Sequence, residues 1–121
     1  MNNDLAIMIV DDQALMGDAL KAILCNLGFT NIFYAPNRET ALNLFQSIEI
    51  DIVFMDINLD RHNGLKLIQE MLKIKSEFFP IIVSAESNID NVREAIKIGV
   101  KSFIVKPFQP GKIKEVLKSF L

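Results

Sequence analysis

Short hydrophobic runs alternate along the chain with longer segments in which hydrophobic residues recur every three or four positions. The short runs cover residues 5–10, 30–35, 50–55, 81–83 and 103–105 and predict strands, most of them buried on both faces. The longer segments have the spacing of helices with one apolar face. Five alternations without a linker predict an α/β domain whose parallel sheet is doubly wound, with helices on both faces.

The ends of the predicted helices are marked by residues with suitable conformational preferences. Asparagine and serine cap helix N-termini, proline fits the first helical position, and glycine ends a helix in the left-handed conformation. The first helix is expected at about residues 13–27. The end-marking residues are Gly28, Asn37, Asn63, Ser87 or Asn88, Gly99 and Pro110. The apolar helix positions are Leu20, Ile23, Leu24, Leu27, Ala41, Leu44, Phe45, Ile48, Leu65, Ile68, Leu72, Val92, Ala95, Ile96, Ile113, Val116, Leu117 and Phe120.

Composition indicates one compact domain with a local interaction surface. A chain of 121 residues with 50% hydrophobic side chains is expected to form one domain, residues 1–121, around a sizeable core. The net charge of −2 disfavours general binding to nucleic acid or anionic membranes, which needs clustered Lys and Arg. The N-terminus has no signal-peptide or membrane-spanning pattern, so a cytoplasmic location is expected.

Cys25 and His62 are the single residues of their types. One cysteine excludes an internal disulfide, and its place in the apolar pattern of the first helix predicts a core position as a small hydrophobe. A histidine without partners at ligand spacing favours an exposed loop residue over a zinc site. Neither residue indicates redox or zinc chemistry.

Charged and hydroxyl side chains stand directly after four of the predicted strands. They are Asp11, Asp12, Asp56, Ser84 and Lys106. The carboxyl ends of the strands form the ligand crevice of an open α/β sheet, so these side chains are expected to meet there. Three carboxylates, a hydroxyl and an ammonium suit a hard divalent cation together with a phosphoryl group.

The adjacent carboxylates of Asp11 and Asp12 require a positive group, because two negative charges in one crevice are costly. Oxygen ligands without His or Cys favour Mg²⁺, with Mn²⁺ as an alternative, over zinc. The three carboxylates, Lys106 and a divalent cation sum to zero charge, so a phosphoryl group would meet little electrostatic resistance. Buried or helix-capping charges without a function are the alternative interpretation of this set.

Four motifs in order at four strand ends resemble the receiver domain of two-component response regulators. The motifs are Val10–Asp12, Phe54–Leu59 with Asn63–Gly64, Ser84–Ala85 and Lys106–Pro107. The resemblance covers essentially the whole chain and includes single-domain chemotaxis receivers. It implies a flavodoxin-like fold with five helices, strand order 2-1-3-4-5 and a cis peptide bond between Lys106 and Pro107.

The resemblance also implies a role for each site residue. Asp56 would accept the phosphoryl group, and Asp12, Asp56 and the backbone carbonyl of Asn58 would bind Mg²⁺ directly. Asp11 would help to bind the cation through water. Lys106 would pair with the phosphate, while the Ser84 hydroxyl and the Ala85 backbone N–H would bind another of its oxygens.

A conformational switch is implied by the same resemblance. Ser84 would move toward the phosphate and Phe103 would turn inward, changing the face formed by the fourth helix, fifth strand and fifth helix. A plain core role for Phe103 is the alternative. Asn58 and Glu86 would flank the path of hydrolytic water and favour a short-lived phosphorylated state. The family usually has a proline four residues after the acceptor, and Asp60 there predicts a loop of different shape.

The implied partners are a histidine kinase or phosphotransfer protein and a downstream protein or output domain. Dimerisation through the last two helices is left undecided by the charge pattern. The chain would be a regulatory phosphoacceptor that catalyses only its own phosphorylation and dephosphorylation. Two alternatives are a phosphatase or phosphotransferase with an Asp nucleophile, disfavoured because Gln13 stands two residues after Asp11, and a scaffold that needs no phosphorylation.

Overall fold

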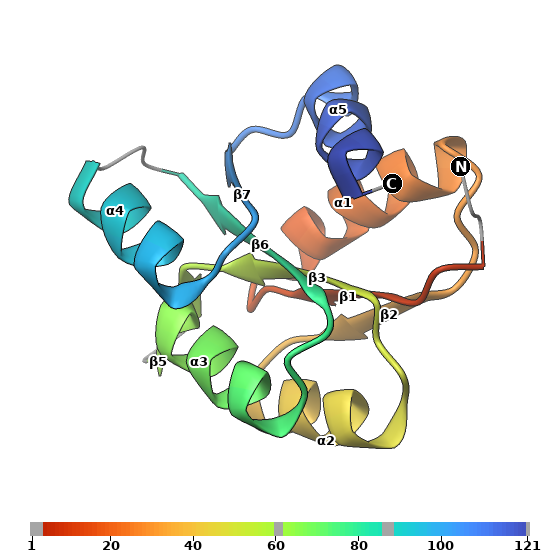
Figure 1. Ribbon diagram of the computed structural model, residues 1–121. Coiled ribbons are helices and arrows are strands. Elements are labelled where there is room, and N and C mark those ends of the chain that lie inside the picture. The colour runs from red at the N-terminus through yellow and green to blue at the C-terminus, as the bar shows by residue number, and fades with distance from the viewer. Residues whose placement is uncertain (1–3, 60–61, 86–88, 121) are drawn as a thin grey trace.

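A five-stranded parallel sheet forms the centre of the computed structural model, which describes residues 4–59, 62–85 and 89–120 (Figure 1). The strand order is β2-β1-β3-β6-β7, which confirms the predicted order 2-1-3-4-5 because β6 and β7 are the fourth and fifth strands of this sheet. The strands are β1 (Ile7–Val10), β2 (Ile32–Ala35), β3 (Ile52–Asp56), β6 (Phe79–Ser84) and β7 (Ser102–Val105).

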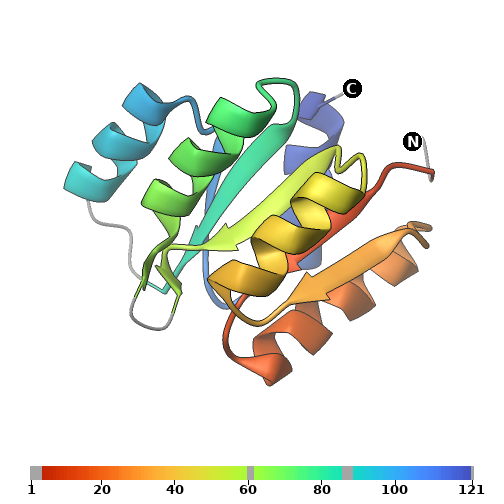
Figure 2. The same ribbon diagram turned by 90° about the horizontal axis from the view of Figure 1, so that it is seen from below.

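Helices cover both faces of the sheet, as predicted for a doubly wound fold. They are α1 (Ala14–Asn26), α2 (Arg38–Ser47), α3 (Gly64–Ile74), α4 (Ile89–Ile98) and α5 (Pro110–Phe120). Figures 1 and 2 show α1 and α5 on one face and α2, α3 and α4 on the other. Among the described residues, no helix is long and apolar enough to cross a membrane.

The hydrophobic core lies in two layers, one on each side of the sheet. Successive residues of a strand point to opposite faces, so Met8 and Val10 join the layer under α2, α3 and α4, whereas Ile7 and Ile9 join the layer under α1 and α5. All four β1 residues are buried. This burial on both faces explains why β1 and the fully buried β3 are continuous apolar runs in the sequence.

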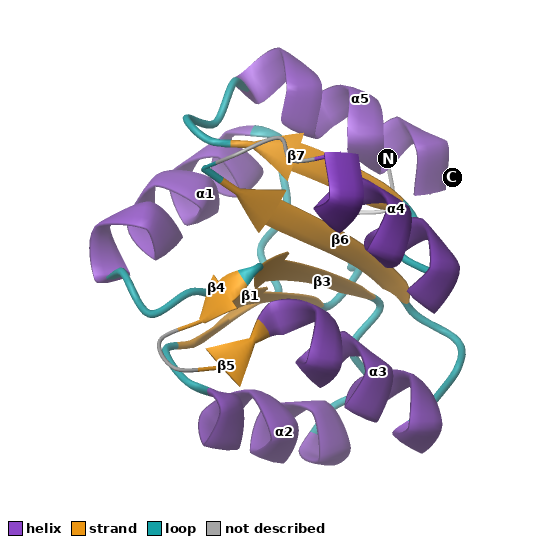
Figure 3. Cartoon of the chain, turned by 90° about the vertical axis from the view of Figure 1, so that its left-hand side faces the viewer, coloured by secondary structure: helices purple, strands orange, loops and turns teal. Residues whose placement is uncertain are grey.

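Two differences from the predicted strands have local causes. β6 begins at Phe79 rather than Ile81. Pro80 does not fit a typical strand pattern, but its carbonyl still accepts a hydrogen bond from the backbone N–H of Lys101 at 2.9 Å. A two-stranded ribbon of β4 (Asn58–Leu59) and β5 (His62–Asn63), visible in Figure 3, was not predicted because each strand has only two residues.

Most predicted helix ends are confirmed. Asn37 accepts a hydrogen bond from the backbone N–H of Thr40, and Asn63 accepts one from Leu65. Gly28 and Gly99 have φ values of 98° and 110°, in the left-handed region that favours glycine. Pro110 is the first residue of α5. Ser87 and Asn88, predicted to open the fourth helix, lie outside the described residues, as do Asp60 and Glu86.

Two predicted core positions are wrong. Cys25 is exposed, and Ile96 is 68% exposed. Each directly follows a buried residue, Leu24 and Ala95 respectively, and one helical step rotates a side chain by about 100°. The apolar stretch in the sequence is therefore wider than the stripe that reaches the sheet.

Candidate functional site

The register of the parallel sheet brings the predicted site residues together at one edge. Val10 pairs with Met55, so the next residues, Asp11 and Asp56, lie side by side. Asp56 pairs with Val83 in β6, and Ser84 follows. Ser84 in turn pairs with Val105, which places Lys106 directly beyond. Four strand ends therefore contribute to one site, as the sequence predicts.

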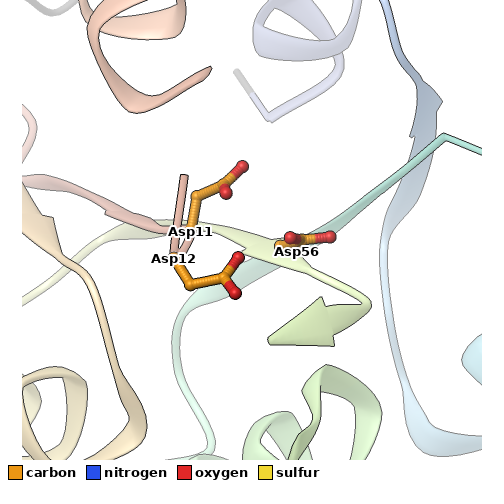
Figure 4. Close-up of side chains that lie close together, drawn as sticks. All are labelled: Asp11, Asp12 and Asp56. Carbon is orange, nitrogen blue, oxygen red and sulfur yellow. The ribbon is translucent and has the colours of Figure 1, made fainter. Parts of the chain in front are cut away.

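Three carboxylates occupy the middle of this edge. One oxygen from each of Asp11, Asp12 and Asp56 lies within 4.8 Å of the others. Figure 4 shows the Asp11 and Asp12 carboxylates extending toward the side of Asp56. Asp11 and Asp56 are buried, whereas Asp12 is exposed. The cluster is thus buried at its base and open to solvent on one side.

Asp11 is held by hydrogen bonds with four other residues. Its backbone N–H donates to the carbonyl of Ala35 at 3.1 Å, and its own carbonyl accepts from the Tyr34 hydroxyl at 2.6 Å. Its side chain accepts from the backbone N–H of Gln13 at 2.9 Å and from the Lys106 ammonium at 3.0 Å. These contacts fix the turn between β1 and α1.

Lys106 is the cationic side chain at the carboxylate cluster. Its Nζ lies 3.0 Å from Asp11 Oδ2 and 3.6 Å from Asp56 Oδ2. The predicted approach of Lys106 to the carboxylates is confirmed, but its direct ion pair with Asp11 was not predicted. The peptide bond between Lys106 and Pro107 is cis, as the family resemblance implies.

The electrostatic balance at Asp56 is unfavourable to its charge. Burial raises the pKa of the Asp56 carboxyl above its ordinary value, and the charges of Asp11 and Asp12 raise this pKa further. Lys106 and the hydrogen bond from the Asn58 backbone N–H, 3.2 Å from Asp56 Oδ1, act in the opposite direction. The net effect raises the Asp56 pKa, so the single ammonium of Lys106 does not neutralise the cluster. A divalent cation would supply the missing positive charge.

The remaining predicted site residues surround the cluster. Ser84 is 1% exposed at the end of β6, and its carbonyl accepts a hydrogen bond from the Lys106 backbone at 2.7 Å. Ala85 is exposed beside it. Phe103 is partly buried and packs against the core on the α2–α4 side of the sheet. Glu86 lies outside the described residues, so its predicted influence on dephosphorylation stays a prediction.

Tyr34 is a site neighbour that the sequence analysis missed. It belongs to β2, whose pattern carries no acidic or basic residue at its end. A signal was nevertheless present, because Tyr34 is the only tyrosine and stands at the carboxyl end of the strand beside β1. Neighbouring strands share the crevice at their carboxyl ends, so a polar side-chain atom at the end of β2, such as the Tyr34 hydroxyl, also reaches it.

Comparison with known proteins assigns the family. A family model described as the response regulator receiver domain matches residues 7–118. The chain belongs to this family. Receiver domains are regulatory modules of two-component signalling, and the carboxylate cluster lies where such a domain has its acidic pocket.

Similar receiver domains include several chemotaxis proteins. The chemotaxis protein CheY of Thermotoga maritima is 40% identical over 111 residues, which cover 92% of this chain and 92% of that protein. CheY of Bacillus subtilis is 35% identical over 115 residues, covering 95% of this chain and 96% of that protein.

Solved structures agree with this fold. The chain matches the structure of a CheX–CheY complex with BeF₃ and Mg²⁺ from Borrelia burgdorferi with a TM-score of 0.89 and 27% identity, covering 95% of this chain and 87% of that chain. A response regulator from Thermotoga maritima matches with a TM-score of 0.88 and 26% identity, covering 97% of each chain.

Proposed function

We propose that Asp56 accepts a phosphoryl group from a histidine kinase or phosphotransfer protein in a Mg²⁺-dependent reaction. The observation that carries this proposal is a buried carboxylate flanked by two further carboxylates and a lysine ammonium at the carboxyl end of the sheet. A desolvated carboxylate in this position is a suitable nucleophile once its charge is balanced. A receiver domain of this kind regulates other proteins and acts chemically only on its own aspartate.

The residues present fit a divalent cation. The ligands are oxygen atoms, and burial together with Asp11 and Asp12 raises the Asp56 pKa, so positive charge is needed at the cluster. Asp12, Asp56 and the Asn58 carbonyl would hold Mg²⁺ directly. Asp11 would act through water, since its two oxygens already accept from Gln13 and Lys106. Bound Mg²⁺ would neutralise the negative charge that gathers on the phosphoryl oxygens.

The chain's own residues would then orient the transfer. An Asp56 carboxylate oxygen forms a bond to phosphorus while the bond from phosphorus to the donor nitrogen or oxygen breaks, and the leaving atom keeps the electron pair. Lys106 would exchange part of its contact with Asp11 for a phosphoryl oxygen. The Ser84 hydroxyl and the Ala85 backbone N–H would bind another oxygen of the same group.

The phosphorylated domain would signal through the surface of α4, β7 and α5. Ile96 and Val105 are 68% and 43% exposed on this surface, and a hollow of 190 Å³ between α4 and β7 is lined in part by Ala95 and Phe103. Inward movement of Ser84 and Phe103 would reshape this surface for a downstream protein or output domain. Asn58, beside the acceptor, would allow water to end the signal.

The alternative functions have less support from the residues. A phosphatase with an Asp nucleophile would need a second acidic residue two positions after Asp11, where Gln13 donates its backbone N–H to Asp11 instead. A scaffold without phosphorylation would not need to keep an acceptor, a cation cluster and a lysine together.

Intact-mass measurement after incubation with acetyl phosphate and Mg²⁺ tests the proposal. We expect one added phosphoryl group on the wild type and none on Asp56→Asn. Asp18→Asn, which removes an exposed carboxylate on α1, is the matched control and should label like the wild type. Omission of Mg²⁺ should prevent labelling. An unlabelled wild type would favour the scaffold, and equal labelling of Asp56→Asn would assign the acceptor elsewhere.

A further inference from the structure

The ring of Tyr34 packs on α1 at Gly17, where the Cβ of any other residue would collide with the ring in its present position. A Cβ atom built at Gly17 would lie 2.6 Å from Tyr34 Cε1 and 2.9 Å from Cδ1, closer than real Cβ contacts. Glycine costs helix stability relative to alanine, and Gly17 is in the first half of α1, where no left-handed conformation calls for it. The missing side chain therefore serves the position of the Tyr34 ring.

The placement of this ring directs its hydroxyl to the acidic cluster. Tyr34 Oη donates to the backbone carbonyl of Asp11 at 2.6 Å, although Tyr34 lies on a different strand. That carbonyl belongs to the peptide group that joins Asp11 to Asp12. Because a peptide group is planar, holding its oxygen also fixes the orientation of the Asp12 nitrogen and so limits where the Asp12 side chain can point.

The other contacts of Asp11 act on different atoms. Ala35 binds its backbone N–H, and Gln13 and Lys106 bind its side chain. Tyr34 reaches the peptide on the Asp12 side from outside the β1–α1 turn. The exposed Asp12 carboxylate therefore depends on this peptide for its direction toward Asp56 (Figure 4).

We infer that Tyr34 is a positioning residue for the cation site, and that Gly17 provides the space that lets it act. The inference rests on the proposed Mg²⁺ site. Tyr34 is 37% exposed, so its hydroxyl is not a core contact whose loss would unfold the domain. Its effect belongs to the preorganisation of Asp12 rather than to general stability.

Calorimetric titration with Mg²⁺ separates these roles. Tyr34→Phe keeps the ring and removes the hydroxyl, and it should raise the Mg²⁺ dissociation constant about 3- to 10-fold. Gly17→Ala should have a similar effect by displacing the ring, and the double variant should be little worse than either one, since both act through one hydrogen bond. Gly111→Ala is the matched control, because a Cβ there meets no atom within 4 Å.

Two readouts distinguish positioning from structural damage. The urea midpoint of Tyr34→Phe in EDTA should stay close to that of the wild type. In labelling with acetyl phosphate, the half-saturating Mg²⁺ concentration should rise by the same factor as the dissociation constant, whereas the maximal rate should be kept. Because the chain has one tyrosine and no tryptophan, Tyr34 emission should also follow Mg²⁺ binding in the wild type.

The outcomes separate the inference from the function on which it rests. A wild-type protein that binds Mg²⁺ and a Tyr34→Phe variant with the same affinity would overturn the inference alone. A parallel loss of Mg²⁺ affinity and urea midpoint would also overturn it, since that is a structural role. Absence of Mg²⁺ binding by the wild type itself would remove the cation site and the inference together.

Discussion

At the scale of single residues, the charges of the site make the folded state less stable. Burial and the neighbouring carboxylates oppose the ionised form of Asp56, and Lys106 offsets only part of this effect. Such groups collect in functional sites because ligand binding, rather than folding, uses their charge. The acidic cluster should therefore destabilise the domain when no cation is bound.

This cost predicts how stability depends on pH. The Asp56 pKa is raised in the folded protein, so the folded state binds its proton more tightly than the unfolded state does. Stability therefore falls as pH rises from the ordinary pKa of an aspartate through the raised pKa of the folded state. Asp56→Asn removes the titration. Without Mg²⁺, the variant should therefore exceed the wild type in free energy of unfolding by about 1 kcal/mol at pH 7.

Urea unfolding in EDTA across a pH series measures this difference. The gap between Asp56→Asn and the wild type should narrow as pH falls toward the ordinary pKa of an aspartate, because the wild-type carboxyl then becomes protonated. Asp18→Asn should show no comparable gain. A gap that widened at acidic pH would contradict the proposed environment of Asp56.

At the scale of elements, the start of α3 is fitted closely against the end of β3. The Gly64 backbone N–H donates to the carbonyl of Ile57 at 2.8 Å, and a Cβ at Gly64 would overlap the carbonyl of Asp56. This close approach places the helix directly behind Asp56, the proposed acceptor. Asn63 accepts from the Leu65 N–H and fixes the same turn.

Gly64→Ala should therefore damage both stability and the site. The added methyl group must push the Asp56 backbone away, which we expect to cost about 1–3 kcal/mol of unfolding free energy and to slow labelling by acetyl phosphate. Gly111→Ala places the same methyl group in open space and should be neutral or stabilising. Urea unfolding and intact-mass time courses provide the comparison, and equal behaviour of the two variants would refute the close fit.

Elements with strong periodic patterns, and the meeting of their strand ends at one edge of the sheet, could be predicted from sequence. The continuous run that forms β1 and the helix ends at Asn37 and Pro110 follow from local preferences. The convergence of Asp11, Asp56 and Lys106 follows from a general property of parallel sheets.

The features that the sequence could not predict depend on the direction of side chains and on packing between elements. Cys25 has the apolar character of its neighbours, but the rotation of α1 leaves it exposed. The pairing of Tyr34 with Gly17 joins residues of different elements, and neither residue carries a recognised motif. The ribbon of β4 and β5 is too short to give a periodic signal.

At the scale of the whole molecule, the acidic cluster and the surface of α4, β7 and α5 are connected through the paired carboxyl ends of β6 and β7. Ser84 and Val105 are paired across these strands, and Lys106 follows directly. Phe103 lies in β7 between the core and the hollow beside α4. Movement of Ser84 at the cluster can therefore reach the outer surface without a change in fold.

Hydrogen exchange of the phosphorylated domain tests this connection. Phosphorylation with acetyl phosphate and Mg²⁺ should change exchange rates in α4 and β7 about 5-fold or more, because a coupling free energy of ordinary size shifts populations by that factor. The second half of α2 should not respond. Asp56→Asn under the same conditions is the control, and a uniform change over all helices would contradict a local switch.

The depth of the ammonium at the acidic cluster has a consequence for the solution conditions in which the domain can work. The Lys106 side chain is only 10% exposed, and its partners Asp11 and Asp56 are buried as well. Mobile ions screen exposed charges much more strongly than charges enclosed by protein. Added sodium chloride should thus leave the Lys106 ion pairs nearly unchanged, and its effects on the reaction should arise at the exposed Asp12 carboxylate and in the docking of a protein partner.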